Sequence, residues 1–247
     1  MTEPAAPRLA RPATLTGESA PADRGAVARE QLIKHATRIF AAKGFAGAAT
    51  REICDAAGAN VAAIHYYFGG KEGLYRAVLM GPIREVTGQF GRFDDPSIPF
   101  EQVIRKVLGA FVDMALNDDP HDLEVTRLHI RESLEPSAIF RELVAQSIVP
   151  QHNGLAALIA AHCGLTRPDV DIHQLTFAMF AMASDYCMSR EFINMLAPQL
   201  LAQKQARARI VDRLVGYSMA LLEHEKKRRA AGTKSAPPLR KPVRKHR

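Results

Sequence analysis

The side chains with the best-defined chemistry lie in residues 50–68, which read T-R-E-I-C-D-A-A-G-A-N-V-A-A-I-H-Y-Y-F. Two segments of about two helical turns flank a turn that contains Gly58, and these are the dimensions of a helix-turn-helix. A glycine is required where the chain reverses with a positive φ. Small residues at Cys54 and Ala57 would let the two helices cross closely. Three apolar residues have the spacing needed to dock the two short helices on the helix before them, and these are Ile53, Ile64 and Phe68.

Two helix starts border this stretch, and each could bind an anion. We expect Thr50 to cap the first short helix, so that its hydroxyl and the free N–H groups of that turn form an anion site. Lys71 should begin the helix after the motif and adds a cation beside another set of free N–H groups. The second short helix would expose a face without acids, made of Asn60, Ala62, Ala63, His65 and Tyr66. Such a helix suits a duplex groove between phosphate rows, although spacing alone also fits a helical hairpin inside an all-α core.

The elements that position these residues are all expected to be helical. Apolar residues recur at three- and four-residue spacing, and alternating β-branched strand patterns are missing. The first helix is predicted over residues 26–43, with Gly44 as its C-terminal stop. Short helices are predicted at 51–57 and 61–67, and a longer one runs from Lys71 to about residue 91 with a kink at Gly81–Pro82. Further helices are predicted at 100–117, 121–134, 137–163 with an interruption at Pro150, 169–190 and 204–229.

Composition and motif searches exclude several classes of protein. The longest uncharged apolar runs are about half of the ~20 residues that a membrane-spanning helix needs. The N-terminus lacks the apolar region of a secretory signal, so we expect a reduced, cytoplasmic protein. No metal site, cofactor or catalytic residue is predicted, because histidine pairs at ligand spacing, a P-loop, a Rossmann glycine pattern and a nucleophile–base pair are all missing. The chain has three cysteines, Cys54, Cys163 and Cys187, and they form no C-x-x-C pair. A disulfide framework or a four-thiolate zinc site is therefore excluded.

Charge is unevenly distributed along the 247 residues, whose net charge is +7. Residues 81–225 are acidic overall, whereas residues 226–247 carry ten basic side chains and no acidic one. A basic end on an acidic body fits a nucleic-acid partner. A solvated tail without a dedicated partner explains the same charge pattern.

Residues 26–79 resemble the DNA-binding domain of TetR-family transcriptional regulators. The resemblance is carried by Ala36-x-x-x-Phe40-x-x-x-Gly44-Phe45, by Thr50-x-x-Ile53-x-x-x-Ala57-Gly58 and by Ile64-His65-Tyr66-Tyr67-Phe68-x-x-Lys71-x-x-Leu74. The stretch R-E-S-L-E-P-S-A-I-F-R-E-L at 131–143, with the chain up to Pro150, is similar to the C-terminal domain of the CecR-type branch. Together the two resemblances cover about residues 26–223.

The resemblance implies roles for individual residues of the motif. Thr50, Tyr66, Tyr67 and Lys71 would contact phosphates, while Arg51 and the exposed residues Asn60, Ala62, Ala63 and His65 would approach base edges. From its own chemistry, Arg51 can bind guanine O6 and N7 together, and the two alanines offer thymine methyl contacts or a close backbone approach. His65 stands where many members carry tyrosine or asparagine, and Tyr67 where many carry histidine, so the target sequence does not follow from the resemblance. Cys54 is interpreted as a small core residue.

The resemblance also implies a domain plan with an all-α fold. We predict a disordered arm at 1–23, a three-helix helix-turn-helix domain at 24–80, a larger dimerisation and effector domain at 81–225 and a basic disordered tail at 226–247. Apolar stripes on the last two helices are predicted to form half of a four-helix dimer interface, with an intramolecular core face as the alternative. These stripes are Ile210, Val211, Leu214, Tyr217, Ser218, Leu221 and Leu222, and Leu175, Ala178, Met179, Met182 and Ala183 flanked by Phe177 and Phe180.

Candidate effector-pocket residues are Arg127 and Arg131, which share one helical face, and Asp185 and Tyr186, which interrupt an apolar helix. Structural ion pairs or surface positions are the alternative for these four. Methionines at 114, 179, 182, 188 and 195 fit either an adaptable pocket lining or plain core. The leading hypothesis is therefore a homodimeric, ligand-responsive repressor of a palindromic double-stranded operator, without a membrane partner. A non-sequence-specific nucleic-acid binder driven by the basic tail is the alternative, and an enzyme has no motif to support it.

Overall fold

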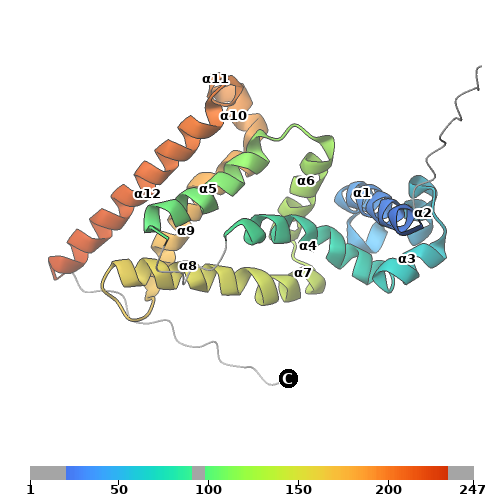
Figure 1. The fold of residues 1–247 in the computed structure, drawn as a ribbon, viewed down its shortest axis with the longest axis horizontal. Helices are drawn as coiled ribbons and strands as arrows, with labels where there is room; N and C mark the ends of the chain where they lie inside the picture. Colours follow the sequence, from blue (N-terminus) through green and yellow to red (C-terminus); the bar gives the residue numbers. More distant parts are fainter. Residues whose placement is uncertain (1–20, 91–97, 233–247) are drawn as a thin grey trace, which may run out of the picture.

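The computed structural model describes residues 21–90 and 98–232, and within these ranges the fold is all-α, as predicted. Figure 1 shows the first three helices gathered at one end of an elongated molecule and α12 at the other. No helix in the described ranges has the length and apolar character needed to cross a membrane. The helices are α1 (Pro21–Gly47), α2 (Thr50–Ala57), α3 (Val61–Phe68), α4 (Lys71–Phe90), α5 (Phe100–Leu116), α6 (Pro120–Leu134), α7 (Ala138–Leu143), α8 (Val149–His162), α9 (Val170–Met188), α10 (Arg190–Leu196), α11 (Gln199–Ala202) and α12 (Ala206–Ala230).

One hydrophobic core holds α1, α2, α3 and the first half of α4 together. Phe40 of α1 and Tyr75 of α4 are fully buried at its centre, with ring centroids 4.7 Å apart in an edge-on arrangement. The same core extends to Leu128 of α6 and Phe140 of α7. The predicted boundary at residue 80 is therefore a boundary along the chain, because side chains of the larger domain complete the core of the smaller one.

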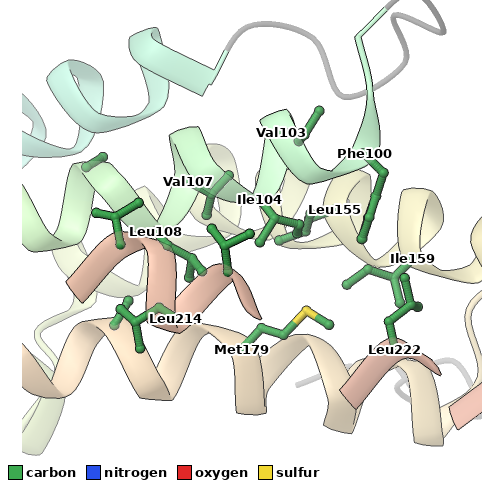
Figure 2. Close-up of a cluster of buried hydrophobic side chains, with 14 of the residues drawn as sticks. Phe100, Val103, Ile104, Val107, Leu108, Leu155, Ile159, Met179, Leu214 and Leu222 are labelled. Carbon is green, nitrogen blue, oxygen red and sulfur yellow. The ribbon is translucent and has the colours of Figure 1, made fainter. Parts of the chain in front are cut away.

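A second core is formed by α5, α8, α9 and α12, and Figure 2 shows its buried side chains. It corrects the predicted dimer interface, because most of the proposed stripe is buried inside the single chain. The helix α5 packs against both α9 and α12 and covers their apolar faces. Helical periodicity shows that a face is buried but does not show what buries it. The affected residues are Leu175, Met179, Ala183, Ile210, Val211, Leu214, Ser218 and Leu222.

Several helix boundaries differ from the prediction. Pro150 does not interrupt the chain, because it lies in the first turn of α8, where a missing N–H costs little, and a π-helical segment (Val144–Ile148) joins α7 to α8. The helices α10 and α11 were not predicted. Helical backbone runs through Gly81–Pro82 to Phe90.

The two predicted disordered ends are corrected where the structure describes them. The helix α1 begins at Pro21, inside the predicted arm, while residues 1–20 lie outside the described ranges. The first residues of the predicted tail belong to α12, and residues 233–247 lie outside the described ranges. Arg229 pairs with Asp169 at 2.8 Å and Arg228 with Asp171 at 2.6 Å, so ion pairs bind the end of α12 to the start of α9.

Candidate nucleic-acid interface

The turn between α2 and α3 has the geometry that the sequence predicts. Gly58 ends α2 in the left-handed conformation, with φ 62° and ψ 30°, and the N–H of Ala59 donates to the carbonyl oxygen of Cys54 at 2.9 Å. Ile53, Cys54 and Ile64 are buried where the two helices meet the first core. Cys54 is therefore a small core residue, and burial raises the pKa of its thiol.

The helix α3 presents a short exposed face without acidic side chains. Tyr66 is 82% exposed, and Ala62 and His65 are exposed beside it. Val61, which the sequence analysis did not select, is also exposed. Ala63 is half-buried and packs against the core, so its methyl group is less available than that of Ala62.

Asn60 has a structural task that the sequence analysis missed. Its side-chain oxygen accepts a hydrogen bond from the N–H of Ala63 at 2.9 Å, so Asn60 is the N-cap of α3. Asparagine directly before a helix is a preferred N-cap, and this signal was available in the sequence. The exposed amide nitrogen of Asn60 remains able to donate to another molecule.

The predicted cap at the start of α2 is wrong. Ala49 is the N-cap, in extended backbone, and no side chain caps the helix. Thr50 is instead the first helical residue and is half-buried. The first-turn N–H groups of α2 still have no partner within the helix, as in any α-helix. The nearby acid Glu52 is neutralised by Lys43, with nitrogen and oxygen 2.7 Å apart.

Cationic groups lie on the helices before and after α3 in the chain, and phenolic groups lie on α3 itself. Lys71 is the first residue of α4, and its ammonium lies 4.7 Å from the centre of the Phe45 ring, a cation–π contact that holds it at the helix start. Tyr67 is half-buried, and its ring meets the Tyr66 ring edge-on at 4.9 Å. Arg51 is exposed and bonds to no residue in the described parts of the chain, so its guanidinium is available to a partner.

The structure does not bring the four candidate effector residues together. Arg127 lies on the surface and pairs with Glu124 at 2.9 Å. The Arg131 guanidinium packs over Gly44, where a Cβ would lie 2.9 Å from it. Asp185 is exposed and accepts from Ser189 at 2.7 Å, and Tyr186 is half-buried, packed against the second core.

An apolar cavity of about 320 Å³ lies instead between α4, α5, α6, α8 and α9, and none of those four residues lines it. Met114 and Met188 belong to its wall, whereas Met179 is core and Met195 is 71% exposed. Burial raises the pKa of the Cys187 thiol in the wall to about 11. Burial and the neighbouring His173 lower the pKa of His152. The complete wall is Ile83, Phe111, Met114, Thr126, His129, Ile148, Gln151, His152, Phe177, Phe180, Ser184, Cys187 and Met188.

Comparisons with known proteins agree with this architecture. The model described as "Bacterial regulatory proteins, tetR family" matches residues 32–78, and the one described as "HTH-type transcriptional dual regulator CecR, C-terminal domain" matches residues 100–223. The chain belongs to the TetR family of transcriptional regulators. This TetR-family regulator is 30% identical over 182 residues to the dual regulator CecR of Shigella flexneri, covering 69% of this chain and 80% of that one. It is 27% identical over 195 residues to the repressor NicS of Pseudomonas putida, covering 73% of this chain and 85% of that one.

Solved structures share the fold of this TetR-family regulator at low sequence identity. A putative regulator from Pseudomonas aeruginosa PAO1 superposes with a TM-score of 0.58 at 17% identity, over 85% of this chain and 95% of that chain. AibR, solved with isovaleryl coenzyme A and operator DNA, superposes with a TM-score of 0.54 at 18% identity, over 77% of this chain and 97% of that chain. Regulators of this family bind DNA and are not enzymes. The described residues contain no cluster of three or more potential metal ligands.

Proposed function

We propose that this DNA-binding regulator is a ligand-responsive repressor that binds a palindromic operator as a homodimer in the cytoplasm. The observation that carries the proposal is the exposed, acid-free face of α3, a helix that packs between α2 and the start of α4 at Lys71. A helix of this size fits the major groove, while cations and free N–H groups bind the phosphates that border it. The repressor named among its relatives, NicS, supports the direction of regulation.

The exposed groups support a division of roles at the DNA. We assign phosphate contacts to Lys71, to the half-buried Thr50 and to the two phenols of Tyr66 and Tyr67. Base contacts are assigned to Arg51, through guanine O6 and N7, and to methyl groups on α3 that pack against thymine. The base-facing groups on α3 are Asn60 through its free amide nitrogen, Ala62, His65 and, through close backbone approach, Ala63.

The dimer is assigned to the faces of α9 and α12 that the single chain leaves exposed. Tyr217 of α12 is 54% exposed, and Ala178 and Ala181 on α9 offer small side chains where two helices could approach closely. One short helix in a DNA groove binds weakly, whereas two copies related by a two-fold axis match the two half-sites of a palindrome. The homodimer therefore keeps part of the predicted stripe, while the rest of the stripe forms the core.

The alternative of a non-specific binder driven by the basic tail loses support from the ion pairs of Arg228 and Arg229. Both guanidinium groups are bound to carboxylates of the same chain. Deleting residues 233–247 separates the two hypotheses. Operator preference should survive the deletion if α3 reads the sequence, and binding should collapse if the tail drives it.

The test is a gel-shift titration on the chain's own upstream DNA, followed by two substitutions with matched controls. Arg51→Ala should relax discrimination at one base pair by about 1–3 kcal/mol. Lys71→Ala should weaken binding to all DNA sequences alike and reduce the slope of the logarithm of affinity against the logarithm of salt concentration by about 1. The controls Arg167→Ala and Lys106→Ala remove exposed charges elsewhere. The role assignment is wrong if both test variants have the same effect on every sequence. The absence of palindrome-specific binding at moderate salt would contradict the proposed function.

A further inference from the structure

The chemistry of the apolar cavity points to the kind of molecule that it binds. We propose that the effector is an uncharged, mainly apolar molecule whose single hydrogen-bonding group lies beside Gln151 and His152. The inference rests on the proposed ligand-responsive function and adds the class of ligand. It is argued from the charge, the hydrogen bonding and the size of the cavity.

No Asp, Glu, Lys or Arg side chain lines the cavity, and its two titratable rings are those of His129 and His152. Its walls are aromatic and aliphatic, with Phe111 and Phe180 meeting edge-on at a centroid distance of 5.6 Å. The rim of the cavity is apolar as well, since Phe177 in its lining is 65% exposed and Met188 in its lining is also exposed. A carboxylate or an ammonium group that entered would lose its hydration and gain no opposite charge. The cavity therefore selects against charged ligands.

Most polar groups of the wall already have partners inside the protein. The ring nitrogens of His129 lie 3.0 Å from the carbonyl oxygen of Val125 and 3.2 Å from that of Leu79, and a neutral ring can donate to only one of them. The thiol of Cys187 donates to a third carbonyl at 2.9 Å, and the hydroxyl of Ser184 to a fourth at 3.4 Å. These groups contribute apolar surface and offer little hydrogen bonding to a ligand.

The hydrogen-bonding capacity that remains is that of Gln151 and His152 on α8 and of the Thr126 hydroxyl on α6. The Gln151 amide has no hydrogen-bond partner in the described parts of the chain. His152 Nε2 lies 2.9 Å from His173 Nδ1, which leaves its Nδ1 for a ligand. Burial and the neighbouring His173 lower the pKa of His152, which favours its uncharged form. One hydroxyl or carbonyl group on the ligand would satisfy the two α8 side chains.

Size restricts the ligand further. The volume of about 320 Å³ is at the lower end of the range of roughly 300–1,000 Å³ for small-molecule sites. A single ring with a short chain suits this volume. The suitable probes are therefore 4-phenylbutanol, 4-phenylbutyrate and 4-phenylbutylamine, which share a skeleton and differ in charge.

The first experiment measures displacement of the neutral dye Nile red from the full-length protein by each of the three probes. We expect 4-phenylbutanol to bind at least tenfold more tightly than either charged analogue. Equal binding by all three, tighter binding by the carboxylate or the amine, or no binding by the alcohol would overturn the proposal. Because it uses the unaltered protein, this comparison does not depend on the folding of any variant.

The second experiment places a charge in the α8 part of the wall. Gln151→Lys should raise the affinity for 4-phenylbutyrate relative to 4-phenylbutanol at least tenfold, whereas Asn153→Lys, which adds the same charge at an exposed position of α8, should leave the ratio unchanged. An unchanged ratio in the Gln151→Lys protein contradicts the assigned orientation. Gel shifts without probe, run in parallel, distinguish a wrong ligand class from a wrong DNA-binding function. If operator binding is intact and the charge preference is absent, only the ligand class is wrong, whereas absent operator binding contradicts the proposed function.

Discussion

The buried bond between Tyr75 and Glu132 makes a quantitative prediction about how the two domains are joined. Tyr75 of α4 donates its phenolic O–H to the carboxylate of Glu132 in α6, which also accepts from the N–H and the hydroxyl of Ser137, both at 2.9 Å. Tyr75 is 0% exposed and Glu132 4%. Replacing Tyr75 with phenylalanine removes the donor and keeps the ring that packs on Phe40.

The expected loss follows from the charge on the acceptor. A hydrogen bond to a charged group contributes about 1.5–3 kcal/mol, and its removal leaves a buried carboxylate with one partner fewer. Tyr75→Phe should therefore lower the free energy of unfolding by about 1.5–3 kcal/mol at pH 7. Urea unfolding followed by circular dichroism at fixed protein concentration measures it. Tyr66→Phe, which removes an exposed hydroxyl, should change stability by less than about 0.5 kcal/mol.

Alkaline pH provides a second readout of the same bond. Burial, the hydrogen bond to Glu132 and its charge raise the pKa of Tyr75 well above its ordinary value. Above about pH 10 the unfolded chain loses this proton while the folded chain keeps it, so stability falls by up to about 1.4 kcal/mol per pH unit. Tyr75→Phe should lack this part of the slope. Equal stability at pH 7, or identical alkaline slopes for the two proteins, would refute the reasoning.

Three further predictions test the reading head and the dimer. A Cβ on Gly73 would lie 1.7 Å from the carbonyl oxygen of Phe68, so Gly73→Ala should destabilise the α3–α4 junction by about 3 kcal/mol or more and abolish DNA binding in gel shifts. Gly81→Ala has open space on the same helix and should stabilise by up to ~1 kcal/mol in thermal unfolding; equal behaviour of the two would contradict the argument. Uracil in place of a thymine contacted by Val61 or Ala62 should weaken binding by about 0.8 kcal/mol per lost methyl, and unchanged affinity at every thymine of the half-site would exclude methyl readout. Ala178→Arg should give monomers in sedimentation and weaken operator binding, while Ala157→Arg, exposed on α8, should remain dimeric; a dimer that survives Ala178→Arg would place the interface elsewhere.

Local features of the chain were predicted well. The all-α class, the positive φ of 69° that interrupts α1 at Gly44 and the left-handed turn at Gly58 follow from periodicity and from conformations that glycine adopts most readily. The burial of Ile53, Cys54 and Ile64 also agrees with their spacing. The cap of α2 was misassigned by one residue because Ala49, which has no capping side chain, takes the extended conformation before the helix.

Contacts between distant segments could not be predicted in the same way. The effector-pocket prediction used a shared helical face for Arg127 and Arg131 and the interruption of an apolar helix by Asp185 and Tyr186. In the structure Arg127 and Asp185 lie on the surface, Arg131 packs over Gly44, and Tyr186 packs against the second core. The cavity takes its wall from five α-helices and the π-helical segment, and the bond between Tyr75 and Glu132 joins residues 57 positions apart.

The amino-acid order alone thus determined the helices, the glycine turn and the acid-free exposed face of α3, because each depends on neighbours within a turn or two of the chain. Only tertiary packing decided which apolar stripes became core, which remained exposed, and where an apolar cavity was left. A helical pattern encodes how strongly a face avoids water, whereas the partner that covers the face depends on how all the helices fit together.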